Sequence, residues 1–167
     1  MCGRTVVELG AGTGVVGIMA GYLGASVIIT DLDSLVPLLN HNLNENRHLL
    51  GAGSVVAKPL CWGNPADSDM LHPDFLVLAN CVYYESSLEN LRETVLALTS
   101  EARSETVILA CYEERTKEIG DLICRWHSML SDYFDIRDIE RDSLDTQYLQ
   151  DYVRIVTMSS RTRHHEK

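Results

Sequence analysis

Near its N-terminus the chain contains the stretch Glu8-Leu9-Gly10-Ala11-Gly12-Thr13-Gly14. A β-branched run at residues 5–9 leads into the glycines and predicts a buried strand, and small and apolar residues at 14–23 predict a short helix after them. Glycines at alternate positions let the backbone turn sharply and approach a ligand, and a helix N-terminus receives polar ligand groups. The stretch therefore predicts a ligand-binding turn. The alternative is a tight turn without a ligand.

Strand and helix patterns alternate along most of the remaining chain. Further strands are predicted at 26–30, 54–57, 74–79 and 106–111, further helices at 35–47, 87–100 and 113–130, and a loop at 59–73. Two last strands, at 133–139 and 152–158, have no helix between them. Strands that alternate with helices pair in parallel through crossover connections. The prediction is an α/β fold with a Rossmann-like, seven-strand, mostly parallel sheet, a C-terminal antiparallel hairpin and helices on both faces.

Length and charge limit the classes of protein to consider. The 167 residues suffice for one domain, which we expect at 1–160, followed by a disordered basic tail at 161–167. The net charge of −10 repels phosphate backbones and favours a positively charged partner over nucleic acid. No apolar run is long enough to span a membrane. The five irregularly spaced cysteines form no CxxC pair, so they indicate a reducing compartment and, with the scattered histidines, predict no metal site.

Two ligands fit the glycine turn. Residues 12–17 satisfy the GxGxxG pattern of dinucleotide-binding proteins, and Asp31 lies near the position that binds the ribose in such proteins. S-adenosylmethionine also carries an adenosine, so Asp31 serves either ligand. Glu8 separates the two, because a carboxylate just before the glycines suits a cationic methionine group and opposes a pyrophosphate. The sequence therefore favours S-adenosylmethionine.

Four segments together resemble one family. They are residues 8–14, Thr30-Asp31-Leu32, Cys61-Trp62-Gly63 and Asn80-Cys81-Val82-Tyr83-Tyr84. They resemble the methyltransferase-like 21 group of seven-strand protein-lysine methyltransferases. Residues 110–116 look most like the branch that methylates valosin-containing protein, an AAA-type ATPase. The resemblance implies a monomeric, cytoplasmic or also nuclear enzyme that methylates a lysine of a protein substrate, such as an AAA-type ATPase or a chaperone, with S-adenosylmethionine as cofactor.

The resemblance also implies which residues bind the cofactor. The residues of the turn, Gly10, Ala11 and Gly12, are expected to line its methionine portion together with Glu8. The three other expected contacts are Asp31 on the ribose, Trp62 near the adenine, and Ala79 at the end of the fourth strand. For Trp62 the alternative is a loop residue that only anchors its segment on the core.

The expected acceptor site departs from the family pattern. Family members carry an acidic residue, two others and then Tyr or Phe after the fourth strand, whereas this chain has Asn80 and Tyr83 at those positions. Asn80 can orient a lysine through its carbonyl oxygen, can indicate a different acceptor as in Asn-Pro-Pro-Tyr methyltransferases, or can indicate weak activity. Tyr83 is expected in the acceptor pocket, with Tyr84 packed against the sheet. Glu113 and Arg115 are either acceptor-side residues or a surface ion pair.

A second class of function stays open. Family members carry an extension before the first strand, whereas here the first strand is expected at residue 5, so we expect weaker retention of the cofactor by this chain. The alternative function is a non-catalytic or truncated methyltransferase-fold module that binds a protein partner. A small-molecule or nucleic-acid methyltransferase ranks third because of the negative charge. No other catalytic motif is present: the chain lacks GxSxG, HExxH and Walker-type patterns.

Overall fold

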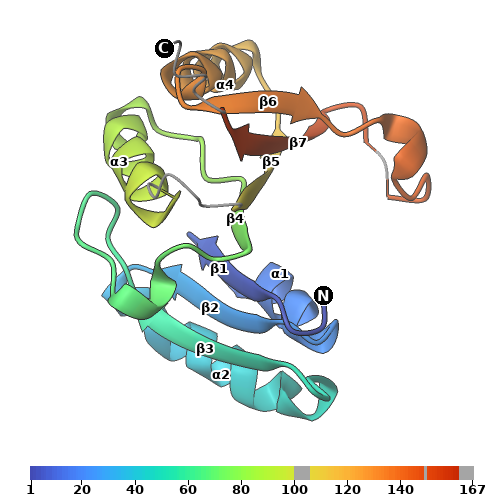
Figure 1. Cartoon of the computed structure of the whole chain (residues 1–167). Coiled ribbons are helices and arrows are strands. Elements are labelled where there is room, and N and C mark those ends of the chain that lie inside the picture. The colour runs from blue at the N-terminus through green and yellow to red at the C-terminus, as the bar shows by residue number, and fades with distance from the viewer. Residues whose placement is uncertain (100–105, 149, 162–167) are drawn as a thin grey trace, which may run out of the picture.

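The computed structural model describes residues 1–99, 106–148 and 150–161, and in them strands alternate with helices as the sequence predicts (Figure 1). The elements are β1 (Thr5–Leu9), α1 (Val15–Tyr22), β2 (Ser26–Asp31), α2 (Val36–Asn46), β3 (Ser54–Pro59), β4 (Phe75–Ala79), α3 (Leu88–Thr99), β5 (Val107–Glu113), α4 (Lys117–Leu130), β6 (Phe134–Asp138) and β7 (Val153–Ser160).

The strands of the described residues form one seven-stranded sheet in the order β3-β2-β1-β4-β5-β7-β6. The first five strands of this order are parallel, and β7 is antiparallel to both β5 and β6. The predicted Rossmann-like sheet with an antiparallel C-terminal hairpin is confirmed. The last strand of the chain occupies the inner position of the hairpin, where Val156 and Met158 are completely buried. The outer strand β6 carries Asp135, Arg137 and Asp138, and charged side chains protect an edge strand from pairing with another chain.

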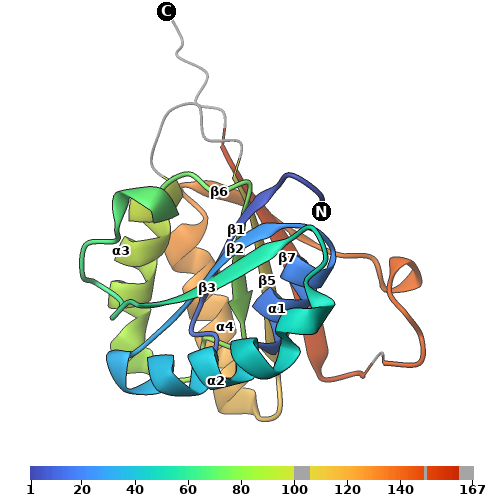
Figure 2. The same ribbon diagram turned by 90° about the horizontal axis from the view of Figure 1, so that it is seen from below.

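Helices cover both faces of the sheet, as predicted. On one face α1 and α2 enclose a core that includes Val27, Ile29 and Leu39. On the other face α3 and α4 pack over a larger core, in which the Trp126 indole is fully buried and donates to the Tyr112 hydroxyl at 3.1 Å. Figure 2 shows α2 along β3, and α1 and α3 on opposite sides of the strands.

The start of α4 and the expected tail differ in detail from the sequence prediction. The predicted helix from residue 113 is wrong at its beginning, because β5 continues through Glu113 in register with β7. The helix begins only after Thr116, whose hydroxyl accepts from the Ile119 amide. Arg161, expected in a disordered tail, donates its amide to Tyr133 at 3.0 Å and pairs with Asp135 at 2.9 Å. The other tail residues, 162–167, lie outside the described residues.

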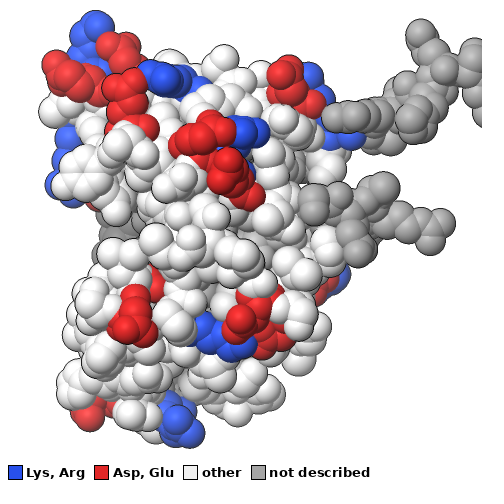
Figure 3. Space-filling view, turned by 90° about the vertical axis from the view of Figure 1, so that its left-hand side faces the viewer, with Lys and Arg blue, Asp and Glu red and all other residues white. Residues whose placement is uncertain are grey.

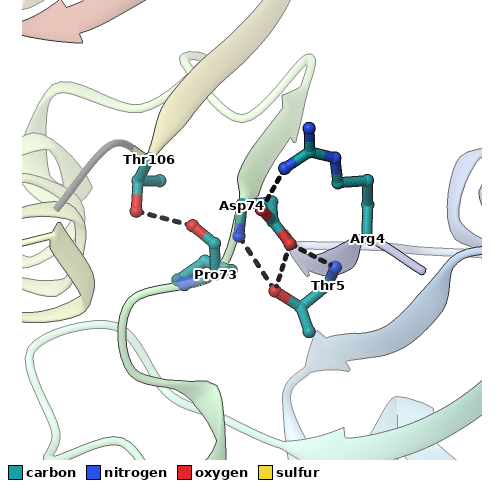
Figure 4. A network of polar contacts seen from close by, with 5 residues as sticks. All are labelled: Arg4, Thr5, Pro73, Asp74 and Thr106. Atoms are coloured by element: carbon teal, nitrogen blue, oxygen red, sulfur yellow. Dashed lines mark hydrogen bonds and ion pairs between the residues drawn. The ribbon is translucent and has the colours of Figure 1, made fainter.

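The amino end of the sheet is closed by a polar network (Figure 4). Asp74, just before β4, accepts from the Thr5 amide at 2.7 Å, from the Thr5 hydroxyl at 3.0 Å and from the Arg4 guanidinium at 2.8 Å. The Asp74 amide donates back to the Thr5 hydroxyl at 2.9 Å. Beside them the Thr106 hydroxyl donates to the Pro73 carbonyl at 2.6 Å. These contacts join the starts of β1, β4 and β5.

Charged side chains are distributed in pairs over much of the surface. On the face seen in Figure 3, most Lys and Arg side chains lie beside Asp and Glu side chains and form no broad basic patch. Lys58, for example, contacts Asp67 at 3.0 Å and Asp69 at 2.8 Å. Among the described residues no helix is long and apolar enough to cross a membrane.

Candidate functional site

The chemistry-bearing residues of the sequence gather at the carboxyl end of the sheet. The five parallel strands all end there, and β1 lies between β2 and β4. Glu8 belongs to β1, Asp31 is the last residue of β2 and Ala79 is the last residue of β4. In open α/β sheets ligands bind beyond the carboxyl ends of the strands, so the fold brings these residues to one site.

The glycine turn connects β1 to α1 in a conformation that requires glycine. Gly10, Gly12 and Gly14 have φ angles of 61°, 57° and 81°, a region that other residues rarely adopt. A Cβ at Gly10 would lie 3.0 Å from the Trp62 ring and 3.2 Å from the Cys81 sulfur, whereas one at Gly12 would meet nothing within 4 Å. The turn is thus tightly packed below Gly10 and open at Gly12, where a ligand can approach the backbone.

Glu8 is the buried carboxylate of the site. Only 1% of the residue is exposed, and its Oε2 accepts from the Gly17 amide at 2.8 Å. That amide lies in the first turn of α1, where N–H groups have no partner within the helix, and Gly14 offers no side chain to cap it. The pKa of Glu8 is raised to about 7, chiefly by burial and to a smaller extent by the negative charge of Asp31, against the lowering effect of the Gly17 N–H.

Asp31 is held against the glycine turn. Its Oδ2 accepts from the Gly12 amide at 2.8 Å, and its Oδ1 accepts from the Leu32 amide at 2.7 Å. Each carboxylate oxygen can accept a second hydrogen bond, and the side chain is only half-buried. The carboxylate is therefore fixed in position by the backbone while it can still bind hydroxyl groups of a ligand.

Trp62 lies in the turn after β3 and reaches the glycine turn, as its contact with Gly10 shows. The ring also packs against the larger core, and the Gly63 amide donates to the Thr94 hydroxyl of α3 at 2.8 Å. Both interpretations of Trp62 thus have support: it anchors its loop, and its ring adjoins the candidate site. Cys81, which the sequence did not single out, is buried and donates its thiol to the Leu9 carbonyl at 3.1 Å.

Asn80 and the two tyrosines follow β4. Asn80 is exposed with a φ of 56°, and its amide donates to the Cys111 carbonyl at 2.8 Å. Asn is among the non-glycine residues that best tolerate this left-handed conformation. The expectation that Tyr84 packs against the sheet is wrong: Tyr83 and Tyr84 are 48% and 65% exposed, with ring centroids 4.7 Å apart. Burial, first of all, raises the pKa of Tyr83, so its hydroxyl keeps its proton at neutral pH.

Glu113 extends β5 beyond the end of β4. Cys111 pairs with Ala79, the last residue of β4. Glu113 lies two residues further along β5, so its side chain is on the same face of the sheet as that of Cys111. Its carboxylate forms an ion pair with the exposed Arg115 guanidinium. The predicted pair of residues is therefore present, next to the turn that carries Asn80.

Sequence reasoning missed two partners of the predicted residues. A Cβ on Gly17 would lie 2.1 Å from Ile29 and 2.7 Å from the Glu8 carboxylate, so this glycine lets α1 approach β1 and β2. The Thr30 hydroxyl, also buried, donates to the Glu8 carbonyl at 2.7 Å. The small residues of the helix were a signal for Gly17. Within the described residues no group of three or more His, Cys, Asp or Glu could hold a metal ion.

Comparisons with known proteins show which proteins the chain resembles. Residues 1–128 match the model of a family described as lysine methyltransferase. The chain is 36% identical over 132 residues to the protein-lysine N-methyltransferase EFM6 of Saccharomyces cerevisiae. This alignment covers 68% of the chain and 51% of EFM6. It is 34% identical over 138 residues to the protein N-lysine methyltransferase METTL21A of Xenopus tropicalis, covering 83% and 60%. The chain therefore spans about half of the first relative and three fifths of the second.

Solved structures share the fold at low sequence identity. A TehB-like SAM-dependent methyltransferase from Corynebacterium glutamicum superposes with a TM-score of 0.66 at 15% identity, over 96% of the chain and 82% of that structure. Magnesium protoporphyrin IX methyltransferase from Synechocystis, with bound SAH, gives 0.65 at 18% identity, over 96% and 75%. These similarities show a methyltransferase fold.

Proposed function

The chain belongs to the lysine methyltransferase family, and from this membership we propose that it transfers a methyl group from S-adenosylmethionine to a lysine side chain of a protein. The observation that carries the proposal is the arrangement of Glu8, Asp31 and Asn80 at the ends of three neighbouring strands around one glycine turn. Domain 1–160 is proposed to act as one unit and as a monomer, in the cytoplasm or also in the nucleus.

The residues present fit S-adenosylmethionine. The buried Glu8 carboxylate faces a cationic methionine group better than a phosphate, because a nearby cation offsets the burial that raises its pKa. Asp31 is positioned to accept from the ribose hydroxyls, and Trp62 offers an aromatic ring for the adenine. The open space at Gly12 admits the ligand to the backbone. Gly10, Ala11 and Ala79 are proposed to contact the ligand as well. When bound, the cofactor supplies an electrophilic methyl group.

The acceptor side has to hold a lysine and help it lose a proton. A lysine side chain is protonated at neutral pH, with a usual pKa near ~10.4, and only the neutral amine is a nucleophile. We propose that the lysine releases its proton to water, and that the Asn80 carbonyl oxygen and the Tyr83 hydroxyl then orient the neutral amine. The Glu113 carboxylate stabilises the positive charge that develops on the nitrogen as the methyl group is transferred. Alignment of the attacking atom supplies much of the acceleration in such a transfer.

The left-handed backbone at Asn80 supports the first of its three interpretations. Asn and Asp adopt this conformation more readily than other residues with a Cβ, so exchange of the family's acid for an amide preserves the turn. The amide keeps an oxygen that can accept from the lysine, although it brings no charge. A lysine acceptor is therefore preferred over a changed acceptor and over an inactive site.

The proposed substrate class is an AAA-type ATPase or a chaperone. Two features support it: the resemblance of residues 110–116 to the branch of the family that acts on such an ATPase, and a net charge of −10, which attracts a lysine-bearing surface. The rival function is a non-catalytic module that binds a protein partner through the same fold.

The test is methyl transfer from radiolabelled S-adenosylmethionine to a purified AAA-type ATPase, with the methylated residue identified by mass spectrometry. Wild-type protein is expected to label a lysine, Asn80→Asp to label it at least as fast, and Asn80→Leu to label it at least about tenfold more slowly. If the protein binds the cofactor but no variant transfers a methyl group to this substrate or to any protein of a cell extract, the result would favour the non-catalytic module.

A further inference from the structure

A second hollow lies beside the candidate acceptor site and shares none of its residues. It has a volume of about 300 Å³, and we call it the β7 cavity. Its lining combines aliphatic side chains, Leu144 and Ile155 among them, with Tyr152 and with charged residues. The charged residues are Glu114, Asp138, Arg154 and the pair of Arg141 and Asp151, whose side chains lie 3.0 Å apart. Pockets of about 300–1,000 Å³ with apolar walls and a few polar groups are typical ligand sites.

The β7 cavity opens at the same end of the sheet as the acceptor site. Glu114 directly follows β5, Asp138 is the last residue of β6, and Tyr152 precedes β7. The Glu114 amide donates to the Tyr152 carbonyl at 2.7 Å and so closes the cavity on one side. Figure 1 shows the chain after β6 leaving the sheet as a wide loop, and this loop supplies Leu144.

The charges around the cavity are unequally satisfied. Arg154 is bound to Asp138 through two contacts of 2.5 and 3.1 Å, and this guanidinium lowers the pKa of Asp138. Glu114 lies 3.8 Å from Arg154, too far for a hydrogen bond. Its carboxylate, 38% exposed, therefore has capacity for a stronger cationic partner next to an aliphatic wall.

We propose that the β7 cavity receives a lysine or arginine side chain of the protein substrate, other than the lysine that is methylated. Its aliphatic stem would pack on Leu144 and Ile155, and its charge would pair with Glu114. Long basic side chains bury their stems along apolar surface in this way and keep the charged end at the rim. The inference rests on the proposed function, because it names a recognition subsite beside the acceptor site.

The spacing of the strands predicts where that basic residue stands. The strand β5 separates β4, which ends beside Asn80, from β7. Adjacent strands lie about 4.8 Å apart, so the two subsites are roughly 10 Å apart. An extended peptide covers about 3.3 Å per residue. The second basic residue is therefore expected about three residues from the methylated lysine in an extended segment.

The test uses short fluorescent peptides with a central lysine and a single arginine placed at each successive offset, compared with a peptide that has no arginine. Binding is measured by anisotropy in the presence of S-adenosylhomocysteine, and methyl transfer is measured separately. At the favoured offset wild-type protein is expected to bind about tenfold more tightly than it binds the arginine-free peptide. Glu114→Gln and Leu144→Ser should remove this gain, whereas Asp142→Asn, an exposed acid of the same loop outside the cavity lining, should keep it.

The outcomes separate this inference from the proposed function. Transfer to the peptides with no preference for any offset would leave the function standing and overturn the cavity as a subsite. A preference that Glu114→Gln removes, without transfer to any peptide, would support the subsite and count against the function. Binding of no peptide, or a preference unchanged in both cavity variants, also overturns the subsite. Unfolding midpoints of the variants exclude a loss of fold as the cause.

Discussion

At the amino end of the sheet, Asp74 is bound by the Thr5 amide, the Thr5 hydroxyl and the Arg4 guanidinium. At the carboxyl end Asp31 is bound by two backbone amides only, and the turn beside it is open at Gly12. Asp74 directly precedes β4 and Asp31 is the last residue of β2, so both carboxylates flank parallel strands of the same sheet. One closes the structure, whereas the other is held in place with its remaining hydrogen-bonding capacity available.

The difference shows that the amino end of the sheet contributes stability, whereas the carboxyl end carries the candidate binding site. The pKa of Asp74 is lowered, first by the Thr5 amide and then by Arg4, so its charged form stabilises the fold. The carboxyl end instead contains a buried Glu8 with a raised pKa and a left-handed Asn80, and both features cost stability. Local rules are commonly broken at functional sites and satisfied elsewhere. The following predictions test this division, from the largest effect to the smallest.

Asp31→Ala should give the largest effect, on cofactor binding. Loss of hydrogen bonds from hydroxyl groups to a charged acceptor is expected to weaken S-adenosylmethionine binding by about a hundredfold, roughly 3 kcal/mol. Isothermal titration with S-adenosylmethionine and S-adenosylhomocysteine measures it. The control is Asp33→Ala, an exposed acid two residues further on, which should bind as wild type does. Equal affinities of the Asp31→Ala and wild-type proteins would contradict the assignment.

Asp74→Ala should lower the stability of the fold and leave cofactor binding unchanged, the reverse of Asp31→Ala. Removal of the charged hydrogen bonds that join β1 to β4 is expected to lower the free energy of unfolding by about 2 kcal/mol. Urea denaturation measures this loss, and cofactor affinity in the folded protein should stay unchanged. Because the pKa of Asp74 is lowered in the fold, its contribution is present above the usual value of 3.8 and disappears as the pH falls through the folded value. A cofactor affinity that falls with stability would show that the two ends are coupled.

Glu8 should make cofactor affinity depend on pH. With a pKa of about 7 in the free protein, Glu8 releases a proton when a cationic ligand binds beside it. Affinity should rise between about pH 6 and pH 8, by up to about tenfold for each unit by which the ligand lowers that pKa. Titration calorimetry in two buffers of different ionisation enthalpy counts the released protons. Glu8→Gln keeps an acceptor for the Gly17 amide and should flatten the profile; the same slope in this variant would refute the role of Glu8.

The raised pKa of Glu8 also has a consequence for stability, with the sign opposite to that of Asp74. The unfolded chain loses this proton near the usual value of 4.5, and the folded protein keeps it up to about 7. The free energy of unfolding should therefore fall as the pH rises through this interval. Unfolding midpoints of wild type and Glu8→Gln across the interval measure it, and parallel curves would contradict it.

Asn80→Ala should give the smallest effect, on stability. A left-handed conformation costs an alanine about 1 kcal/mol more than it costs glycine, so the free energy of unfolding should fall by about that amount. Asn80→Gly is the matched control and should leave stability near that of wild type. Equal losses in both variants would mean that the asparagine side chain, and not the backbone conformation, stabilises this turn.

The predictable part of the fold is the part coded by local patterns. The apolar runs at 5–9, 26–30 and 74–79 predict β1, β2 and β4 closely, because a strand buried on both faces needs few polar residues. The beginning of α4 was missed, since pairing with β7 extends β5 through Glu113. That pairing joins residues far apart in the sequence, which no local pattern contains.

The candidate site likewise has features that local patterns predict and features that depend on tertiary contacts. The sequence predicts Glu8, the glycine turn, Asp31 and Asn80, because each stands at the end of a strand where a parallel sheet collects ligand-binding groups. It does not predict that Glu8 caps α1 through the Gly17 amide. Nor does it predict that Tyr84 is exposed, since aromatic residues after a strand are common in cores.

The sequence by itself determined the order of the elements, the seven-strand sheet and the positions of the predicted site residues, since spacing and residue type act over a few neighbours. Only the tertiary structure decided that β7 lies between β5 and β6, that Trp62 meets Gly10, and that a cavity forms beside Glu114. Each of these depends on distant segments meeting at a fixed distance. Close packing sets that distance for the whole molecule at once, so it cannot be read from any single stretch of the chain.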